Sequence, residues 1–272
     1  EHRPVSIHSL LKGLVKHKAS DLHVKVGRPP LYRINGKLLP AKLPPLNSED
    51  VKRLAYSTMT QKQIKEFEEG MQIDFGYLVP GLARFRANVF MQKGTLAFVI
   101  RVVPLEVPVL GSLNLPGVVA EIALKPRGLL LVTGATGSGK STTLAAMVDE
   151  INATRTTHVM TIEDPIEYLH RDNRSIINQR EIGVDTNGFA PALRSALRQD
   201  PDVILVGEVR DADTARIAVQ SALTGHLVLS SLHGTDSVAA LHRMLDMGIE
   251  SFLIASSVVA VIGQRLLRRI CD

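Results

Sequence analysis

The sequence has one cysteine, no tryptophan and few aromatic side chains. Because an intrachain disulfide needs two cysteines, Cys271 cannot form one, and this suits a reducing compartment. Aromatic residues make up only 4% of the 272 residues, so aliphatic side chains are expected to build the hydrophobic cores. A small secreted fold held together by disulfides is therefore excluded.

Long apolar segments are absent as well. No run approaches the roughly 20 residues that a membrane-spanning helix needs. The N-terminus lacks the apolar segment and the small-residue cleavage site of a signal peptide. Hydrophobic residues form 45% of the chain and charged residues 22%, as in soluble globular proteins. We therefore expect a cytoplasmic protein with no transmembrane segment.

Positive charge exceeds negative charge, with a formal net charge of +5. A basic balance suits nucleic acid, an anionic membrane face or nucleotide phosphates. However, no run of lysine and arginine is interleaved with aromatic side chains that would stack on bases. The basic N-terminal stretch from His8 to Arg28 is better explained as a solvated helix face. We expect no nucleic-acid partner.

Residues 1–103 predict a mixed α+β domain. An amphipathic pattern with apolar residues at helical spacing begins at Ile7. Short strand-like runs follow, and Asn35-Gly36 between two of them is a signal for a two-residue hairpin turn. Asn47 precedes a second helical pattern and is the expected cap of that helix. Helix and strand signals therefore mix along this half of the chain.

A linker and a second domain are expected after residue 103. Structure-breaking residues there are Pro104, Pro108, Gly111 and Pro116, which predict a linker over residues 104–116. Residues 117–272 alternate strand patterns with helical patterns, which predicts an α/β domain with a parallel sheet covered on both faces. Its predicted strands are 128–133, 158–162, 203–206 and 226–231, and its predicted helices are 138–151, 214–223, 237–245 and 252–267.

Residues 134–141 match the phosphate-loop pattern G-x-x-x-x-G-K-[ST] in full, between a predicted strand and a predicted helix. The glycines permit a tight loop whose backbone N–H groups point at phosphate oxygens. Lys140 supplies charge to the β- and γ-phosphates, and Ser141 offers a hydroxyl to Mg²⁺. Motif and context together predict binding of Mg-ATP rather than an ordinary glycine-rich turn. The predicted nucleotide ligands in this segment are Gly134, Ala135, Thr136, Gly137, Ser138, Gly139, Lys140, Ser141 and Thr142.

Two carboxylates follow apolar strand patterns, and ATP hydrolysis needs both an acid near the metal and a group that orients water. These are Glu163 and Glu208. Both are expected at the carboxyl edge of the sheet, where the phosphate loop also lies. Gly207 separates Glu208 from its strand, which departs from the usual Walker B pattern. For Asp164, Glu167 and Asp202, capping and turn roles explain the carboxylates equally well.

Histidines and arginines near these segments have two open interpretations. His226 and His233 stand at the two ends of one predicted strand, and a histidine at the carboxyl end can sense a γ-phosphate. The chain has nine histidines, however, and most must be bystanders. The arginines Arg84, Arg86 and Arg210 are either fingers that act in trans or ordinary surface residues, and spacing alone favours the second.

Four motifs, in this order, resemble those of the secretion ATPase family. That family includes the retraction and extension motors of type IV pili and the type II secretion motor. The motifs are the Walker A loop 134–141, the Asp box 161–167, the Walker B stretch 200–211 and the His box 225–233. The similarity extends over nearly the whole chain, from Ala19 to Arg269. Chance assembly of all four motifs is negligible.

The resemblance implies a two-domain protomer, in which a smaller α+β (PAS-like) domain precedes a RecA-like P-loop core. It also implies a homo-hexameric motor that hydrolyses ATP. Such a motor works against an inner-membrane platform protein of a pilus or secretion machine. The protein would then be associated peripherally with the inner membrane through that machine.

The resemblance also assigns roles by position. Glu163 corresponds to the acid that activates water, and Glu208 to the Walker B acid near Mg²⁺. His233 and His226 correspond to the His box, and together with Lys140 these residues form the implied catalytic set. Arg84, Arg86 and Arg210 correspond to arginines at the phosphates, partly supplied by a neighbouring subunit.

The two halves resemble different branches of the family. Residues 19–30 and 81–88 resemble the retraction motor, whereas residues 244–257 and 264–269 resemble the extension and type II motors. We expect that the C-terminal part of the family core is missing and that Cys271 is the candidate first cysteine of a zinc insert. The prediction is a motor for pilus retraction or assembly.

Three alternatives stay open beside that prediction. They are a type II secretion or pilus-extension ATPase, a P-loop nucleic-acid motor, and a regulatory switch that binds ATP without acting as a motor. The presence of both Glu163 and Glu208 argues against the switch.

Overall fold

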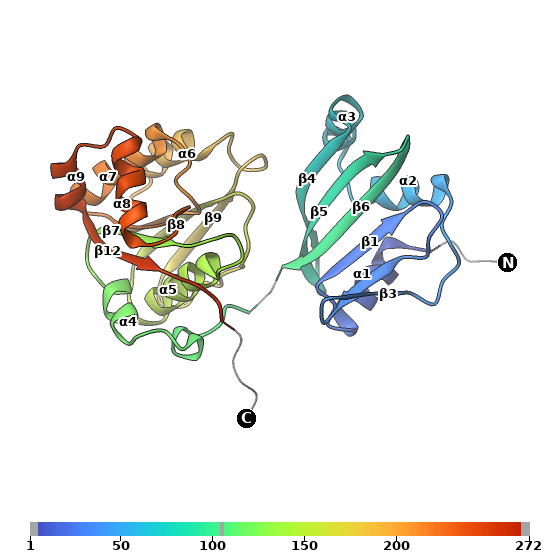
Figure 1. Cartoon of the computed structure of the whole chain (residues 1–272), viewed down its shortest axis with the longest axis horizontal. Coiled ribbons are helices and arrows are strands. Elements are labelled where there is room, and N and C mark those ends of the chain that lie inside the picture. The colour runs from blue at the N-terminus through green and yellow to red at the C-terminus, as the bar shows by residue number, and fades with distance from the viewer. Residues whose placement is uncertain (1–4, 104–105, 268–272) are drawn as a thin grey trace. The chain divides into compact units, whose positions relative to one another are not determined.

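The computed structural model describes residues 5–103 and 106–267. The chain divides into two compact units, residues 1–105 and 106–272 (Figure 1). Pro104 of the predicted linker and Cys271, the candidate zinc ligand, lie outside the described residues. Within the described ranges, no helix is both long enough and apolar enough to cross a membrane.

The first unit is built on one six-stranded antiparallel sheet in the order β3-β2-β1-β6-β5-β4. Its elements are α1 (Ile7–Lys16), β1 (Asp21–Lys25), β2 (Leu31–Ile34), β3 (Lys37–Pro40), α2 (Ser48–Tyr56), α3 (Gln61–Gly70), β4 (Gln72–Val79), β5 (Ala83–Gln92) and β6 (Thr95–Val103). This arrangement confirms the predicted α+β character of the first half.

Local sequence signals explain several boundaries of this unit. The side chain of Ser6 accepts a hydrogen bond from Ser9 N and caps α1, and Asn47 caps α2 in the same way. Asn35 and Gly36 have φ angles of 50° and 79°, as the two central residues of a type I′ hairpin require. The predicted hairpin is therefore formed by β2 and β3.

Buried and more exposed side chains alternate along the strands, so the first sheet has one buried face. Leu22 and Val24 of β1 lie in the core with apolar residues of the helices. Phe85 and Phe98 are also fully buried there, among core residues that are mostly aliphatic, as the composition predicted. Side chains on a strand alternate between faces, so Arg84 lies on the opposite face of β5 from Phe85.

The second unit contains a six-stranded sheet in the order β12-β7-β11-β10-β8-β9, and every neighbouring pair is parallel. Its elements are η1 (Leu110–Leu113), α4 (Val118–Ala123), β7 (Gly128–Thr133), α5 (Lys140–Thr154), β8 (His158–Glu163), β9 (Ile176–Glu181), α6 (Phe189–Ala196), β10 (Val203–Val206), α7 (Ala212–Leu223), β11 (Leu227–Leu232), α8 (Ser237–Asp246), α9 (Ser251–Ser257) and β12 (Val258–Gly263).

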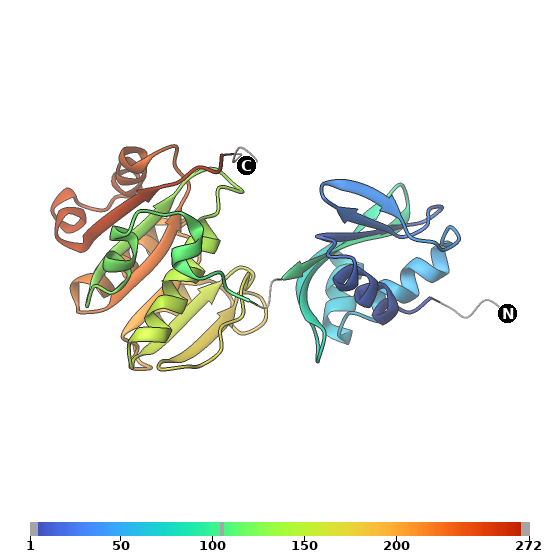
Figure 2. The same ribbon diagram turned by 90° about the horizontal axis from the view of Figure 1, so that it is seen from below.

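Helices cover both faces of this sheet (Figure 2). Leu130 and Val132 of β7 pack with apolar residues of α4 and α5, whereas Leu129 and Leu131 face the core that α6, α7, α8 and α9 share. Both sides of the central strands are therefore buried, which explains their continuous apolar sequences. Leu110, in the predicted linker, is only 5% exposed and packs in the core beneath α4 and α5.

The predicted helix over residues 252–267 is wrong. Helix α9 ends at Ser257, and the chain continues as β12, which pairs in parallel with β7. The segment 258–262 reads Val-Val-Ala-Val-Ile, and β-branched residues favour a strand when a neighbouring strand is available. The sequence interpretation also missed β9 and α6.

Candidate active site

Four strands deliver the predicted motifs to one edge of the second sheet. The carboxyl ends of parallel strands meet at the same edge. In spatial order, β7 leads into the phosphate loop, β11 ends before His233, β10 ends before Glu208, and β8 ends at Glu163. The fold therefore brings these motifs together although they are far apart in the sequence.

The phosphate loop connects β7 to the N-terminus of α5. Gly134, Gly137 and Gly139 have φ angles of 154°, 77° and 87°, which favour glycine. The first turn of α5 directs backbone N–H groups and the positive end of the helix dipole back toward the loop. Such a segment can bind an anion.

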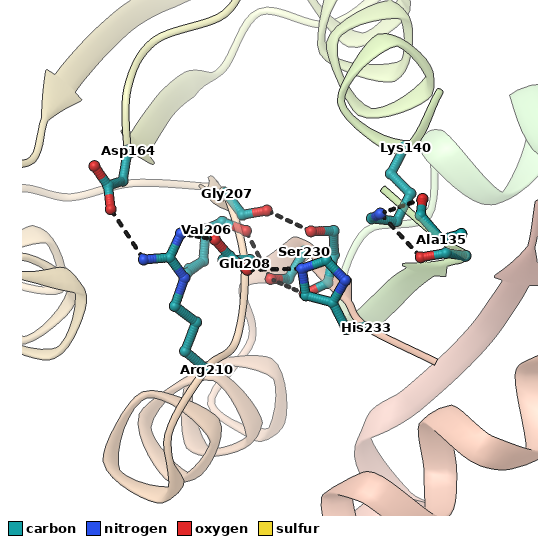
Figure 3. Close-up of polar contacts among 11 residues, drawn as sticks. Ala135, Lys140, Asp164, Val206, Gly207, Glu208, Arg210, Ser230 and His233 are labelled. Carbon is teal, nitrogen blue, oxygen red and sulfur yellow. Dashed lines mark hydrogen bonds and ion pairs between the residues drawn. The ribbon is translucent and has the colours of Figure 1, made fainter. Parts of the chain in front are cut away.

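The Lys140 side chain reaches back over this loop. Its ammonium donates hydrogen bonds to the carbonyl oxygens of Gly134 and Ala135, each at 3.0 Å (Figure 3). An ammonium carries three N–H bonds, so these two contacts leave one for an anion. The loop thereby holds a positive charge close to its own backbone donors.

Glu208 lies at the centre of a row of polar side chains. One carboxylate oxygen pairs with Arg210, and the other lies 3.4 Å from Nε2 of His233 (Figure 3). Arg210 also contacts Asp164 at 3.1 Å. The hydrogen bond to Glu208 raises the pKa of Arg210, so the guanidinium stays charged. The side chain of Glu208 is only 16% exposed, and this row keeps its negative charge balanced.

Two buried serines of β11 hold the backbone on which Glu208 stands. The hydroxyl of Ser230 donates to Val206 O at 2.6 Å, and that of Ser231 donates to Gly207 O at 2.7 Å. The N–H of Val209 in turn donates to Ser231 O at 3.0 Å. The segment around Glu208 is therefore fixed from the neighbouring strand.

Glu163 belongs to a separate network. It accepts hydrogen bonds from Thr161 Oγ1 at 2.7 Å and from Gln179 Nε2 at 3.1 Å. Burial raises the pKa of Glu163 above its ordinary value, although these two hydrogen bonds act in the opposite direction. A carboxylate with a raised pKa is better suited to take a proton near neutral pH.

The first turns of α5 are linked to the segment after β8. Thr142 Oγ1 and the hydroxyl of Tyr168 are 3.0 Å apart, and Gln179 Nε2 donates to Tyr168 O at 2.9 Å. Because Gln179 also contacts Glu163, these bonds connect the start of α5 with the Asp box. Ser141, the predicted magnesium ligand, lies in the same first turn of α5.

Two sets of predicted site residues do not belong to this edge of the second sheet. His226 precedes β11 at the amino edge of the sheet, where Nδ1 lies 3.0 Å from Ser221 O. The six residues of β11 span roughly 20 Å, so the strand separates His226 from His233. Arg84 and Arg86 belong to β5 of the first unit, where Arg86 makes two hydrogen bonds with Asp74 at 3.0 and 2.8 Å.

Sequence reasoning missed most of the polar residues that support this edge. Thr161, Ser230 and Ser231 interrupt otherwise apolar strands and are 0%, 0% and 6% exposed. A buried hydroxyl needs a hydrogen-bond partner, so a polar residue in an apolar parallel strand is itself a signal. Gln179 gave no such signal because β9 is an edge strand with a polar sequence.

Comparison with known proteins places this chain in a family. The family model described as type II/IV secretion system protein matches residues 4–272. The chain belongs to the type II/IV secretion family. That family contains ATPases of type IV pilus and type II secretion machines, which confirms the predicted class of enzyme.

Individual members of the type II/IV secretion family are similar over most of the chain. The type IV pilus retraction ATPase PilT of Pseudomonas aeruginosa is 45% identical, covering 98% of this chain and 79% of PilT. A type II secretion system protein E of Aeromonas hydrophila is 40% identical, covering 97% of this chain and 54% of that protein. A crystal structure of the pilus retraction motor PilT with bound ADP superposes with a TM-score of 0.93 at 46% identity, covering 97% of this chain and 79% of that one.

Proposed function

We propose that the chain is one protomer of a hexameric motor ATPase that drives retraction of a type IV pilus. The observation that carries this proposal is the similarity to PilT over 98% of the chain. It coincides with the convergence of the four motifs at one edge of the second sheet. ATP hydrolysis at that edge would supply the energy for the work of the motor.

The loop from Gly134 to Ser141 would cradle the ATP phosphates. Mg²⁺ prefers oxygen ligands, which the Ser141 hydroxyl and the Glu208 carboxylate provide. One oxygen of Glu208 already pairs with the Arg210 guanidinium and the other lies near the His233 imidazole, but a carboxylate has about four acceptor sites and so can serve a metal as well. A bound magnesium ion would offset the negative charge of the phosphates.

Hydrolysis needs a water molecule to attack the γ-phosphate. Glu163 is proposed to take a proton from that water, since its raised pKa suits a general base. His233 directly follows β11, the strand between β7, which leads to the phosphate loop, and β10, which precedes Glu208, and it is proposed to sense the γ-phosphate. His226 lies at the other end of that strand, and we assign it no role within the same protomer.

Arg84 and Arg86 are proposed to act on the nucleotide of a neighbouring protomer. In this proposal residues 1–103 form the arginine-bearing domain, residues 104–116 the linker and residues 117–272 the RecA-like core. Closure of one domain on the adjacent core would couple ATP binding to rigid-body motion. The ring would lie on the cytoplasmic side of the inner membrane, against a platform protein.

Gene deletion tests the direction of work. Deleting the gene is expected to abolish twitching and leave cells with excess pili, because extension continues without retraction. Reintroducing the wild-type gene should reverse both effects, whereas a Lys140→Ala allele should not. Loss of pili after deletion would contradict retraction.

Type II secretion is the second candidate function. It is favoured by the 40% identity to a type II secretion system protein E over 97% of the chain. The same deletion separates the two, because a secretion motor would leave piliation unchanged and would block export of secreted enzymes. Secretion assays on the deletion strain therefore decide between them.

A further inference from the structure

Gln264 lies directly after β12, next to the phosphate loop. Its N–H donates to Thr133 O at 2.8 Å, which extends the pairing of β12 with β7 by one residue. Thr133 is the last residue of β7 before the loop begins. The backbone of Gln264 is thereby fixed at the point where the phosphate loop leaves the sheet.

The side-chain amide of Gln264 bridges the loop and α5. Its Nε2 donates to Ser138 O at 2.8 Å, and its Oε1 accepts from Thr143 Oγ1 at 2.8 Å. A carbonyl oxygen only accepts hydrogen bonds, so the Ser138 contact fixes which end of the amide points to the loop. One side chain therefore spans from the last strand to both the loop and the helix.

Gln264 also fits closely against two loop glycines. A Cβ atom at Gly139 would lie 2.7 Å from Gln264 Nε2, and a Cβ atom at Gly134 would collide with Gln264 O. In contrast, a Cβ atom at Gly137 would meet nothing within 4 Å. Close approach to Gln264 is thus a second reason, beyond the φ angle, for glycine at positions 134 and 139.

The bond to Ser138 O controls the direction of a backbone donor. In a trans peptide the carbonyl of Ser138 and the N–H of Gly139 point in opposite directions. Gln264 holds that carbonyl, so the N–H of Gly139 points away from Gln264. Gly139 has a φ angle of 87°, and glycine adopts many backbone conformations, so an external bond helps to select this orientation.

We propose that Gln264 is a positioning residue for phosphate binding, acting by fixing the Ser138–Gly139 peptide so that Gly139 N–H faces the nucleotide. The proposal rests on the proposed ATPase function and adds a residue outside the four motifs. Coupling between sites is reciprocal, so nucleotide binding should also stabilise the end of β12. A residue that only ended β12, without contacting the loop, would not couple nucleotide binding to the end of that strand.

The test compares Gln264→Met with the wild type, using the full chain. Methionine has a similar length but makes neither amide hydrogen bond. Amide hydrogen exchange without nucleotide is expected to accelerate in residues 134–142 and to stay unchanged in residues 21–101. The Kd for a fluorescent ADP and the KM for ATP should each rise about 10-fold or more, the size expected for a hydrogen bond to a charged group. The matched control is Gln199→Met, which makes the same change at an exposed glutamine of the same unit.

Thr143 provides a second pair of variants in case Gln264→Met does not fold. Thr143→Val releases one end of the Gln264 amide and should raise loop exchange and Kd, whereas Thr143→Ser keeps the hydroxyl and should restore both. Unchanged exchange and ADP affinity in Gln264→Met, or in Thr143→Val, would overturn the proposal. A wild-type chain that does not bind ADP would contradict the proposed function instead. Amide hydrogen exchange without nucleotide would still test whether Gln264 orders the loop.

Discussion

The Nε2 atom of His233 lies 3.4 Å from a carboxylate oxygen of Glu208, although the two residues follow different strands. Neighbouring strands β11 and β10 place them side by side at the carboxyl edge of the sheet. Arg210 occupies the other oxygen of Glu208. The contact therefore joins the His box to the Walker B stretch.

This contact predicts that His233 and Glu208 act as a unit. His233→Ala in the wild-type background should lower kcat about 10-fold or more, since it removes the partner of Glu208 on the side of the phosphate loop. In a Glu208→Gln background the same change should have a smaller effect, because the contact is already weakened. A double-mutant cycle of kcat measures the coupling, and purely additive losses would contradict it.

Glu163→Gln is expected to bind Mg-ATP normally and to hydrolyse it at least ~10²-fold more slowly, because the amide cannot take a proton from water. Steady-state ATPase rates and nucleotide affinity are the measurements. Glu121→Gln, the same change at an exposed position on α4, is the control and should keep full activity. Weaker binding with an unchanged kcat would remove Glu163 from the role of base.

The same variant has an expected effect on stability. A carboxyl pKa raised by folding means that the folded protein binds more protons than the unfolded chain between the two pKa values. Stability contributed by the protonated carboxyl is therefore lost as pH rises through that range. At neutral pH Glu163→Gln should unfold at a temperature equal to or above that of the wild type.

The raised pKa of Glu163 also predicts the pH dependence of turnover. The base must be ionised, so kcat should fall as pH drops through a pKa above the ordinary glutamate value of 4.5. The hydrogen bond from Thr161 lowers this pKa, so Thr161→Val should move the acid limb to higher pH. Thr154→Val, at the exposed end of α5, should leave the profile unchanged. If Thr161→Val left the acid limb unchanged, the pH dependence of kcat would not report the ionisation of Glu163.

The proposed trans arginines can be tested by mixing inactive protomers. Lys140→Ala protomers and Arg84→Ala/Arg86→Ala protomers should each lack activity alone. In a random equal mixture about a quarter of the interfaces in a ring would pair an intact Lys140 with intact arginines, because each interface joins two different surfaces. ATPase activity near that fraction of the wild-type value is expected.

The control for mixing is a protomer that carries all three substitutions. Mixed with Lys140→Ala protomers, which keep their arginines, it supplies no intact Lys140, so activity should not recover. Mixed rings that assemble, as judged by light scattering, yet stay inactive would count against arginines acting across the interface. A fully active monomer would contradict the ring itself.

Short-range patterns made several features predictable from the sequence. The phosphate loop depends on Gly134, Gly137, Gly139 and Lys140, which lie close together in the sequence. The three glycines have the positive φ angles that such a loop requires, and Lys140 begins α5. Apolar runs followed by an acid likewise indicated that Glu163 ends a buried strand and that Glu208 closely follows one. Caps such as Asn47 and the Asn35-Gly36 turn are equally local.

Tertiary structure decided which of these segments meet. The strand order β12-β7-β11-β10-β8-β9 does not follow the chain, so the pairing of Glu208 with His233 and the approach of Gln264 to the phosphate loop are not visible in any local pattern. The direction of β11 likewise separates His226 from the site, although both histidines flank the same motif. The segment after Ser257 became a strand because the edge of β7 was available to pair with it. Spacing along the chain specifies the period of an element, whereas hydrogen bonding between strands and burial of side chains select its neighbours.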